Sequence, residues 1–162
     1  TNQPGTIQSI SATEPGFLVS ISIEPGVTGA GFGGAEGVAR SYDDKGKLLW
    51  QIETELGRTI EHVMYGPIVE KQSSAWIVSW DGQKSIIEVR GAVDGNSLLR
   101  TESNSRVISI EANRKYLALG FENGDIYVVE SDLLSRRLSG GSEADDGNQR
   151  SDLAQKLRKL RK

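Results

Sequence analysis

The most regular alternation of apolar with small or polar positions in the chain lies in residues 115–130, KYLALGFENGDIYVVE. Apolar side chains occupy every second position from Leu117 to Phe121, and a second run rich in β-branched residues follows the pair Asn123-Gly124. An Asn-Gly pair between two such runs indicates a β-hairpin, because a tight type I′ turn needs a positive φ at both central residues. We therefore predict a hairpin over this stretch.

The same pattern occurs twice more upstream. Residues 74–89, SAWIVSWDGQKSIIEV, combine an alternating strand, a glycine-containing turn and a β-branched strand. Near the N-terminus, the strand-like segments 16–23 and 37–42 flank a much longer glycine-rich turn, EPGVTGAGFGGAE. The chain therefore repeats a unit that is built around a hairpin.

Each hairpin also has one strand-like segment before it and one after it. The preceding segments are residues 6–11, 59–64 with 67–70, and 107–111; the following segments, each with a Leu-Leu pair, are residues 47–53, 97–102 and 133–139. The openings at Ile7, Ile60 and Val107 are 53 and 47 residues apart. Four short strands repeated every 40–50 residues, roughly, are typical of β-propeller blades.

We predict an all-β, propeller-like fold of about three four-stranded blades within residues 1–138. The blades would cover residues 6–56, 57–104 and 105–138, followed by a flexible linker at 139–150 and an amphipathic helix at 151–162. An irregular sandwich or barrel with several hairpins is the alternative.

A family resemblance supports the propeller prediction. Residues 42–50, YDDKGKLLW, resemble the turn and outer strand of quinoprotein-like propeller repeats, in which an Asp, a Gly and a Trp recur in this order. Residues 116–130 are similar to a generic WD-type repeat, and Arg100 stands where Trp50 does in the first unit. The resemblance covers residues 6–139 and implies a fold but no single function, because propellers host many unrelated activities.

Three blades are fewer than the four to eight, roughly, of a closed propeller. An open wedge of three blades would expose two sheet faces with apolar side chains, which favours association. We therefore expect a second copy or a different chain to complete the assembly. A piece of a longer protein is the other explanation.

Composition is that of a folded domain with 162 residues, 36% of them hydrophobic and 25% charged. No apolar run approaches the 18–20 residues, roughly, of a membrane span. The absence of cysteine excludes disulfides and thiolate zinc sites and leaves the compartment open. We predict a cytoplasmic location. The net charge of −3 divides into +5 from Arg150 onward and −8 before it, so an acidic body carries a basic tail.

The basic tail predicts an amphipathic helix with leucines spaced i, i+4 and i+7 on one face. Its predicted partner-binding residues are Leu153, Leu157, Leu160, Lys156, Arg158 and Lys159. Docking into a groove on a partner or on this chain's own acidic body is the interpretation we favour. Binding to nucleic-acid phosphates or to an anionic membrane are the alternatives.

The glycine-rich turn contains G-x-G-x-x-G at residues 29–34, GAGFGG. A dinucleotide-binding loop passes directly from a strand into a helix, whereas here Glu24-Pro25-Gly26 intervenes and a β-like segment follows. We therefore predict an enlarged loop between strands, with partner contacts at Gly29, Gly31 and Phe32.

The remaining polar candidates have simpler roles. His62 is the single histidine and has no cysteine companions, so we predict a packed residue rather than a zinc ligand or a triad base. Acids such as Asp43 and Asp81 lie beside the predicted turns, where they would accept hydrogen bonds from backbone N–H groups. We predict no catalytic, cofactor-binding or metal-binding residue.

Taken together, these features predict a non-enzymatic interaction scaffold that assembles with a protein partner or with itself. A quinoprotein-like or hydrolytic propeller enzyme is one alternative, and it depends on residues 42–50. Nucleic-acid binding through the basic tail is the other.

Overall fold

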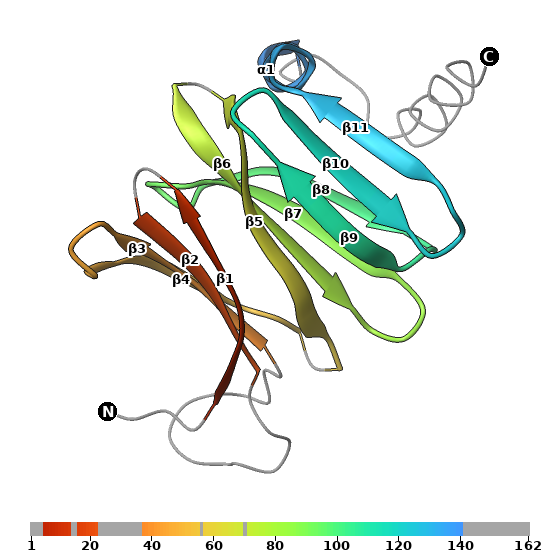
Figure 1. Cartoon of the computed structure of the whole chain (residues 1–162), viewed down its shortest axis with the longest axis horizontal. Coiled ribbons are helices and arrows are strands. Elements are labelled where there is room, and N and C mark those ends of the chain that lie inside the picture. Colours follow the sequence, from red (N-terminus) through yellow and green to blue (C-terminus); the bar gives the residue numbers. More distant parts are fainter. Residues whose placement is uncertain (1–4, 14–15, 23–36, 56, 70, 141–162) are drawn as a thin grey trace.

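The computed structural model describes residues 5–13, 16–22, 37–55, 57–69 and 71–140. These residues form three antiparallel sheets, in which each strand pairs with the next one along the chain (Figure 1). Sheet 1 contains β1 (Thr6–Thr13), β2 (Gly16–Ser22), β3 (Gly37–Asp43) and β4 (Leu48–Glu53). Sheet 2 contains β5 (Thr59–Val69), β6 (Gln72–Trp80), β7 (Ser85–Gly91) and β8 (Ser97–Ser103). Sheet 3 contains β9 (Val107–Ala112), β10 (Tyr116–Phe121) and β11 (Ile126–Glu130).

The mostly β class and the repeated order of the strands are confirmed, but the predicted fourth strand of the third unit is wrong. Residues 133–139 belong to a helix, α1 (Ser131–Gly140), which packs against β5 and β11 (Figure 1). Leu134 is buried in the core and Leu138, four residues later, packs against it, which is the spacing of a helix face. Asp132 in the first turn and Arg137 in the last turn also suit the helix dipole.

The hairpin at residues 115–130 is confirmed, with register from Tyr116↔Glu130 to Gly120↔Ile126. Its turn is not the predicted type I′. Gly124 has a φ of +87°, whereas Lys71 is the sole non-glycine with positive φ among the described residues. Phe121 O accepts from Gly124 N at 2.9 Å, and Phe121 N donates to Asp125 O at 2.9 Å. This pattern is typical of a three-residue loop in which a tight turn is followed by a left-handed glycine.

Sheet 2 is the middle layer and is covered on both faces (Figure 1). Successive side chains of β6 point to opposite faces, so Ala75 and Ile77 pack toward sheet 1 while Trp76 and Val78 pack toward sheet 3. This explains why β6 is an almost continuous buried run. The first strands of the sheets, β1, β5 and β9, are neighbours in space.

Candidate functional site

The contact between sheets 1 and 2 is organised around Trp50 of β4. Its indole Nε1 donates to Ala92 O at 2.9 Å, in the turn between β7 and β8. The ring lies against Gly95, where an added Cβ would come within 2.6 Å of Trp50 Cγ. Beside it, Ser41 Oγ donates to the same Ala92 O at 3.1 Å and shares a hydrogen bond of 3.1 Å with Tyr65 Oη. Sheet 1 is thus joined to the next sheet through directional contacts.

Two of the acids beside the turns, Asp43 and Asp81, have the predicted role. Asp43 Oδ1 accepts from Lys45 N at 2.9 Å and from Lys47 N at 2.8 Å. Asp81 Oδ1 accepts from Gln83 N at 2.8 Å and Lys84 N at 2.7 Å, and these bonds, above all that from Lys84, lower the pKa of the Asp81 carboxyl. The described part of the chain contains no group of three or more His, Cys, Asp or Glu side chains that could hold a metal ion.

A hollow of about 500 Å³ lies where the ends of sheets 1, 2 and 3 converge. Its polar lining residues are Gln8, Ser22, Thr59, Glu61, His62 and Arg106. Arg106 Nε donates to Glu61 Oε1 at 3.0 Å and to Oε2 at 3.1 Å, and Nη2 also donates to Oε1. This carboxylate raises the pKa of the Arg106 guanidinium. The carboxylate of Glu61 and the guanidinium of Arg106, which both line the hollow, therefore neutralise each other in an ion pair.

His62 bridges sheets 2 and 3 at the same hollow. Its Nε2 lies 3.0 Å from Val107 O, and a carbonyl only accepts, so Nε2 carries the proton. Like Arg106, His62 therefore joins neighbouring sheets, which agrees with the prediction of a packed residue. The chemistry of the hollow is that of a polar contact between sheets.

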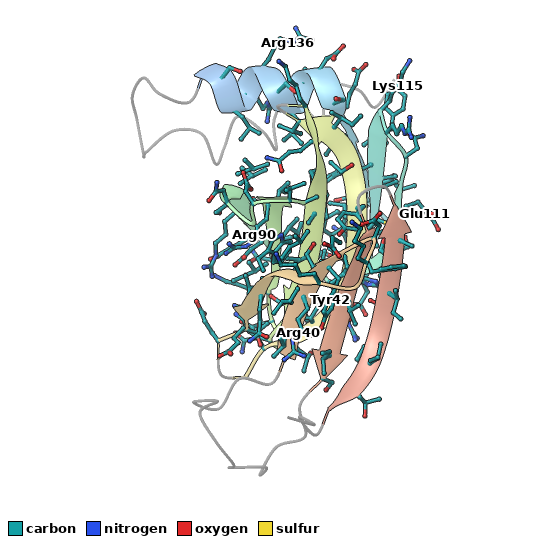
Figure 2. All side chains as sticks on the ribbon, turned by 90° about the vertical axis from the view of Figure 1, so that its left-hand side faces the viewer. Arg40, Tyr42, Arg90, Glu111, Lys115 and Arg136 are labelled. Atoms are coloured by element: carbon teal, nitrogen blue, oxygen red, sulfur yellow. The ribbon has the colours of Figure 1, made fainter. Side chains whose placement is uncertain are left out.

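The outer face of sheet 1 is apolar and exposed. Ile7 is 58%, Ile10 59% and Phe17 43% exposed. Pairing of Ile7 with Ile21 and of Ile10 with Val19 places these side chains on one face, opposite to the buried Leu18. We call this set of β1 and β2 residues open face 1: Ile7, Ile10, Phe17, Val19 and Ile21. Figure 2 views the molecule from the side of sheet 1, with Arg40 and Tyr42 of β3 labelled.

The outer face of sheet 3 is the second exposed apolar surface. Tyr116 is 45%, Val128 56% and Ile126 72% exposed. The pairs Ala118↔Val128 and Gly120↔Ile126 place them on the face opposite to the buried Leu117, Leu119 and Phe121. We call this set open face 3: Tyr116, Ala118, Gly120, Ile126 and Val128. At the sheet edge, β11 pairs with β10, and the described residues provide no strand on its other side.

The predicted partner-binding residues lie outside the described residues. These are Gly29, Gly31 and Phe32 of the glycine-rich turn, and Leu153, Lys156, Leu157, Arg158, Lys159 and Leu160 of the basic tail. Among the described residues, the exposed apolar surfaces are open faces 1 and 3, whose residues were not predicted as partner-binding from the sequence. A signal was present in β11, where Ile126, Tyr127, Val128 and Val129 leave neither face polar.

No family model matches the chain, and no curated protein matches it. Among solved structures, the chain is similar to a protein of unknown function from Bacteroides caccae, with 17% identity and a TM-score of 0.47. The match covers 80% of this chain and 47% of that one, so this chain spans about half the length of that protein. Within the described residues, no helix is long and apolar enough to cross a membrane.

Proposed function

We propose that this chain is a non-enzymatic interaction module made of propeller-type blades, which associates with protein through open faces 1 and 3. The exposure of these two apolar faces is the observation that carries the proposal. Monomeric proteins rarely expose large contiguous apolar patches, and such patches mark interaction sites. Fully burying one Ile, Val or Phe side chain is worth about 1.5–3 kcal/mol, so covering either face would favour association.

The propeller interpretation is supported by the repeated strand order and by the contact of Trp50. Sheets 1 and 2 have four strands in chain order, sheet 3 has three, and the first strands are neighbours. Trp50 joins the last strand of sheet 1 to a turn of the next sheet, so the outer strand of one unit contacts the unit that follows it. Because closed propellers have about four to eight blades, three sheets would supply only part of a ring.

Arg100 fits the same interpretation. Arg100 of β8 occupies the position in the second unit that Trp50 occupies in the first. Sheet 3 ends with β11 and continues into α1, so it has no turn that a tryptophan at this position could contact as Trp50 contacts the turn between β7 and β8. Arg100 instead forms ion pairs with Glu55 at 3.3 Å and Glu88 at 3.7 Å.

The other predicted functions gain no specific support. The enzyme alternative depended on residues 42–50, and there Asp43 accepts turn N–H groups while Trp50 packs between sheets. Nucleic-acid binding, the docking helix of residues 151–162 and the cytoplasmic location stay predictions.

The proposal can be tested with Ile126→Lys/Val128→Lys, which places two charges on open face 3. Sedimentation of the native particle, alone and with candidate partner proteins, should give a mass above that of one chain for the wild type and a lower mass for the variant. Val93→Lys is the matched control, because Val93 is 50% exposed in the turn after β7, away from both faces. Equal association by all three proteins, or none by the wild type, would overturn the proposal.

A further inference from the structure

We infer that the partner is a second copy of this chain, with open face 3 of one copy packed on open face 1 of the other. This inference rests on the proposed function, since it names the occupant of the same two surfaces. Open face 1 of the first copy would meet open face 3 of the second in the same way. A twofold axis would then relate two identical contacts and close the assembly.

The internal contacts of the chain indicate which faces fit together. Each sheet has a leading face toward the following sheet and a trailing face toward the preceding one. Leu18 on the leading face of sheet 1 packs in one core with Ile77 on the trailing face of sheet 2. Trp76 on the leading face of sheet 2 packs with Leu117 on the trailing face of sheet 3. Both internal contacts are therefore leading on trailing.

The two open faces are the one trailing face and the one leading face that pack against no other sheet among the described residues. Open face 1 is the trailing face of sheet 1, because it lies opposite to Leu18. Open face 3 is the leading face of sheet 3, because it lies opposite to Leu117. Packing one on the other would repeat the type of contact that the chain already makes twice. Two copies would bring six sheets together, which is within the usual range of about four to eight blades.

Side-chain size is also complementary between the two open faces. The middle strand of open face 3 carries small residues, Ala118 and Gly120 after Tyr116, with the Ser109 side chain of β9 lying over Gly120. Open face 1 projects Ile10 and Phe17 from its β1 and β2 strands. Small residues against large ones allow side chains of facing sheets to interdigitate, as stable interfaces require.

Small-against-large packing already occurs between sheets 1 and 2. There the leading face presents Ala39 and Ser41, and Tyr65 of the trailing face fills the space above them. The open faces thus have the same division of sizes in the same order, with small residues on the leading face and large ones on the trailing face.

Charge favours the unlike pairing of faces over the like pairing. Glu111 and Glu130 lie on the side of sheet 3 that carries open face 3, through the pairs Glu111↔Ala118 and Glu130↔Tyr116. Packing this face on its own copy would bring carboxylates together. The corresponding side of sheet 1 carries Arg40, paired with Val19, and Glu53, to which Gln51 donates at 3.2 Å. Figure 2 labels Arg40 and Glu111 on their two sheets. With one cation and one carboxylate, this side of sheet 1 carries no excess negative charge, so the unlike pairing avoids the repulsion between carboxylates of the like pairing.

Mixing two variants tests the pairing of the faces. Ile10→Lys/Phe17→Lys alters open face 1, and Ile126→Lys/Val128→Lys alters open face 3. Each variant alone should lose dimerisation by about 100-fold or more, because both contacts of its dimer contain an altered apolar centre. A one-to-one mixture should recover heterodimers, because the intact face 3 of the first variant meets the intact face 1 of the second. One intact contact should bind more weakly than the two contacts of the wild type.

The readout is sedimentation velocity of each protein and of the mixture, with circular dichroism melting to verify that every variant is folded. Val93→Lys should dimerise like the wild type. Dimers of either altered protein alone would overturn the unlike pairing. A mixture that stays monomeric would overturn it as well. A monomeric wild type that binds another protein through open face 3 would refute the second copy and leave the proposed function standing. A wild type that binds neither would refute both.

Discussion

The two contacts that sheet 2 makes with its neighbours differ in their chemistry. Toward sheet 1, small side chains such as Ala39, Ala75 and Ala92 pack beside hydrogen bonds of Trp50 and Tyr65. Toward sheet 3, the core contains much larger apolar groups: Trp76, Ile87, Leu117, Leu119 and Phe121. Hydrogen bonds give directional fit and a net 0.5–1.5 kcal/mol, roughly, each, whereas apolar burial scales with area.

The difference indicates a division of roles along the chain. The contact of sheets 2 and 3, closed at one end by Leu134 of α1, provides most of the apolar stabilisation. The contact of sheets 1 and 2 fixes the position of one sheet relative to the next through Trp50 and Tyr65. Replacing a large apolar residue between sheets 2 and 3 should therefore lower the stability of the chain most. Removing a hydrogen bond between sheets 1 and 2 should have a smaller effect.

The largest expected effect is that of Trp76→Ala. Trp76 is 2% exposed between sheets 2 and 3, and its Nε1 donates to Ser74 Oγ at 2.9 Å. Its removal should lower the free energy of unfolding by about 3–5 kcal/mol, because it leaves a large cavity. Urea unfolding followed by circular dichroism measures this change. Val93→Ala, at an exposed turn, should change it by less than about 0.5 kcal/mol; similar losses for both variants would contradict the division of roles.

An intermediate effect is expected from Gly95→Ala at the contact of sheets 1 and 2. Gly95 has a φ of +70°, and its added Cβ would lie 2.6 Å from Trp50 Cγ. The left-handed backbone costs about 1–2 kcal/mol, and displacing the packed ring adds about 1–3 kcal/mol.

Gly46→Ala is the matched control for that substitution. Gly46 has a φ of +79°, but nothing lies within 4 Å of its added Cβ. Its loss of unfolding free energy should therefore be only the backbone part. In a Trp50→Ala background, the difference between the two glycine variants should shrink, because the ring is gone and only the Cβ of residue 50, 3.0 Å from the added Cβ, remains in contact. Equal losses in the presence of Trp50 would show that the indole does not hold the turn.

The smallest effect is expected from Tyr65→Phe, which removes the hydrogen bond with Ser41. Ser41 keeps its bond to Ala92 O, so the loss should be about 0.5–1.5 kcal/mol. Burial raises the pKa of Tyr65, against a smaller lowering by Ser41. The folded chain therefore holds this proton more tightly than the unfolded chain.

The sign of the pH dependence follows from that difference. Tyr65 contributes stability in full below its unfolded pKa, near 10, and this contribution falls as the pH rises toward the folded pKa. Equilibrium unfolding at several alkaline pH values should show a decline in the wild type that is smaller in Tyr65→Phe. An equal decline in both proteins would contradict the assignment to Tyr65.

Much of the fold was predictable because short-range patterns specify hairpins. The alternation in β10 and the glycines at 46, 95 and 124 place the turns, and repetition gives the order of the sheets. The type of turn after Phe121 was not predictable from Asn-Gly alone, since Asn123 accepts a hydrogen bond from Asp125 N and the glycine alone takes the positive φ.

Helix α1 was predicted as a strand because of a misleading sequence similarity. Leu133-Leu134 resembles the Leu-Leu pairs that begin β4 and follow Ser97 in β8. Those strands come after turns with Gly46 and Gly95, whereas α1 begins at Ser131, directly after β11 ends at Glu130, and leaves no residue for a turn. Without a tight turn the chain cannot reverse into a fourth strand beside β11.

For the candidate site, the presence of three repeats in the sequence predicted two exposed apolar faces, because three blades do not close a propeller. Their residues needed the structure, since Val19 and Leu18 are equally apolar and only the pairing shows which one faces sheet 2. The residues that were predicted to bind partners, in the glycine-rich turn and the basic tail, are not among those described.

The mass of the native wild-type particle tests the pairing of open faces 1 and 3 most directly. Native mass spectrometry of the full chain, from sub-micromolar to high-micromolar concentration, should give twice the mass of one chain, with the monomer appearing only on dilution. A particle with the mass of one chain over the whole range would contradict self-association through these faces.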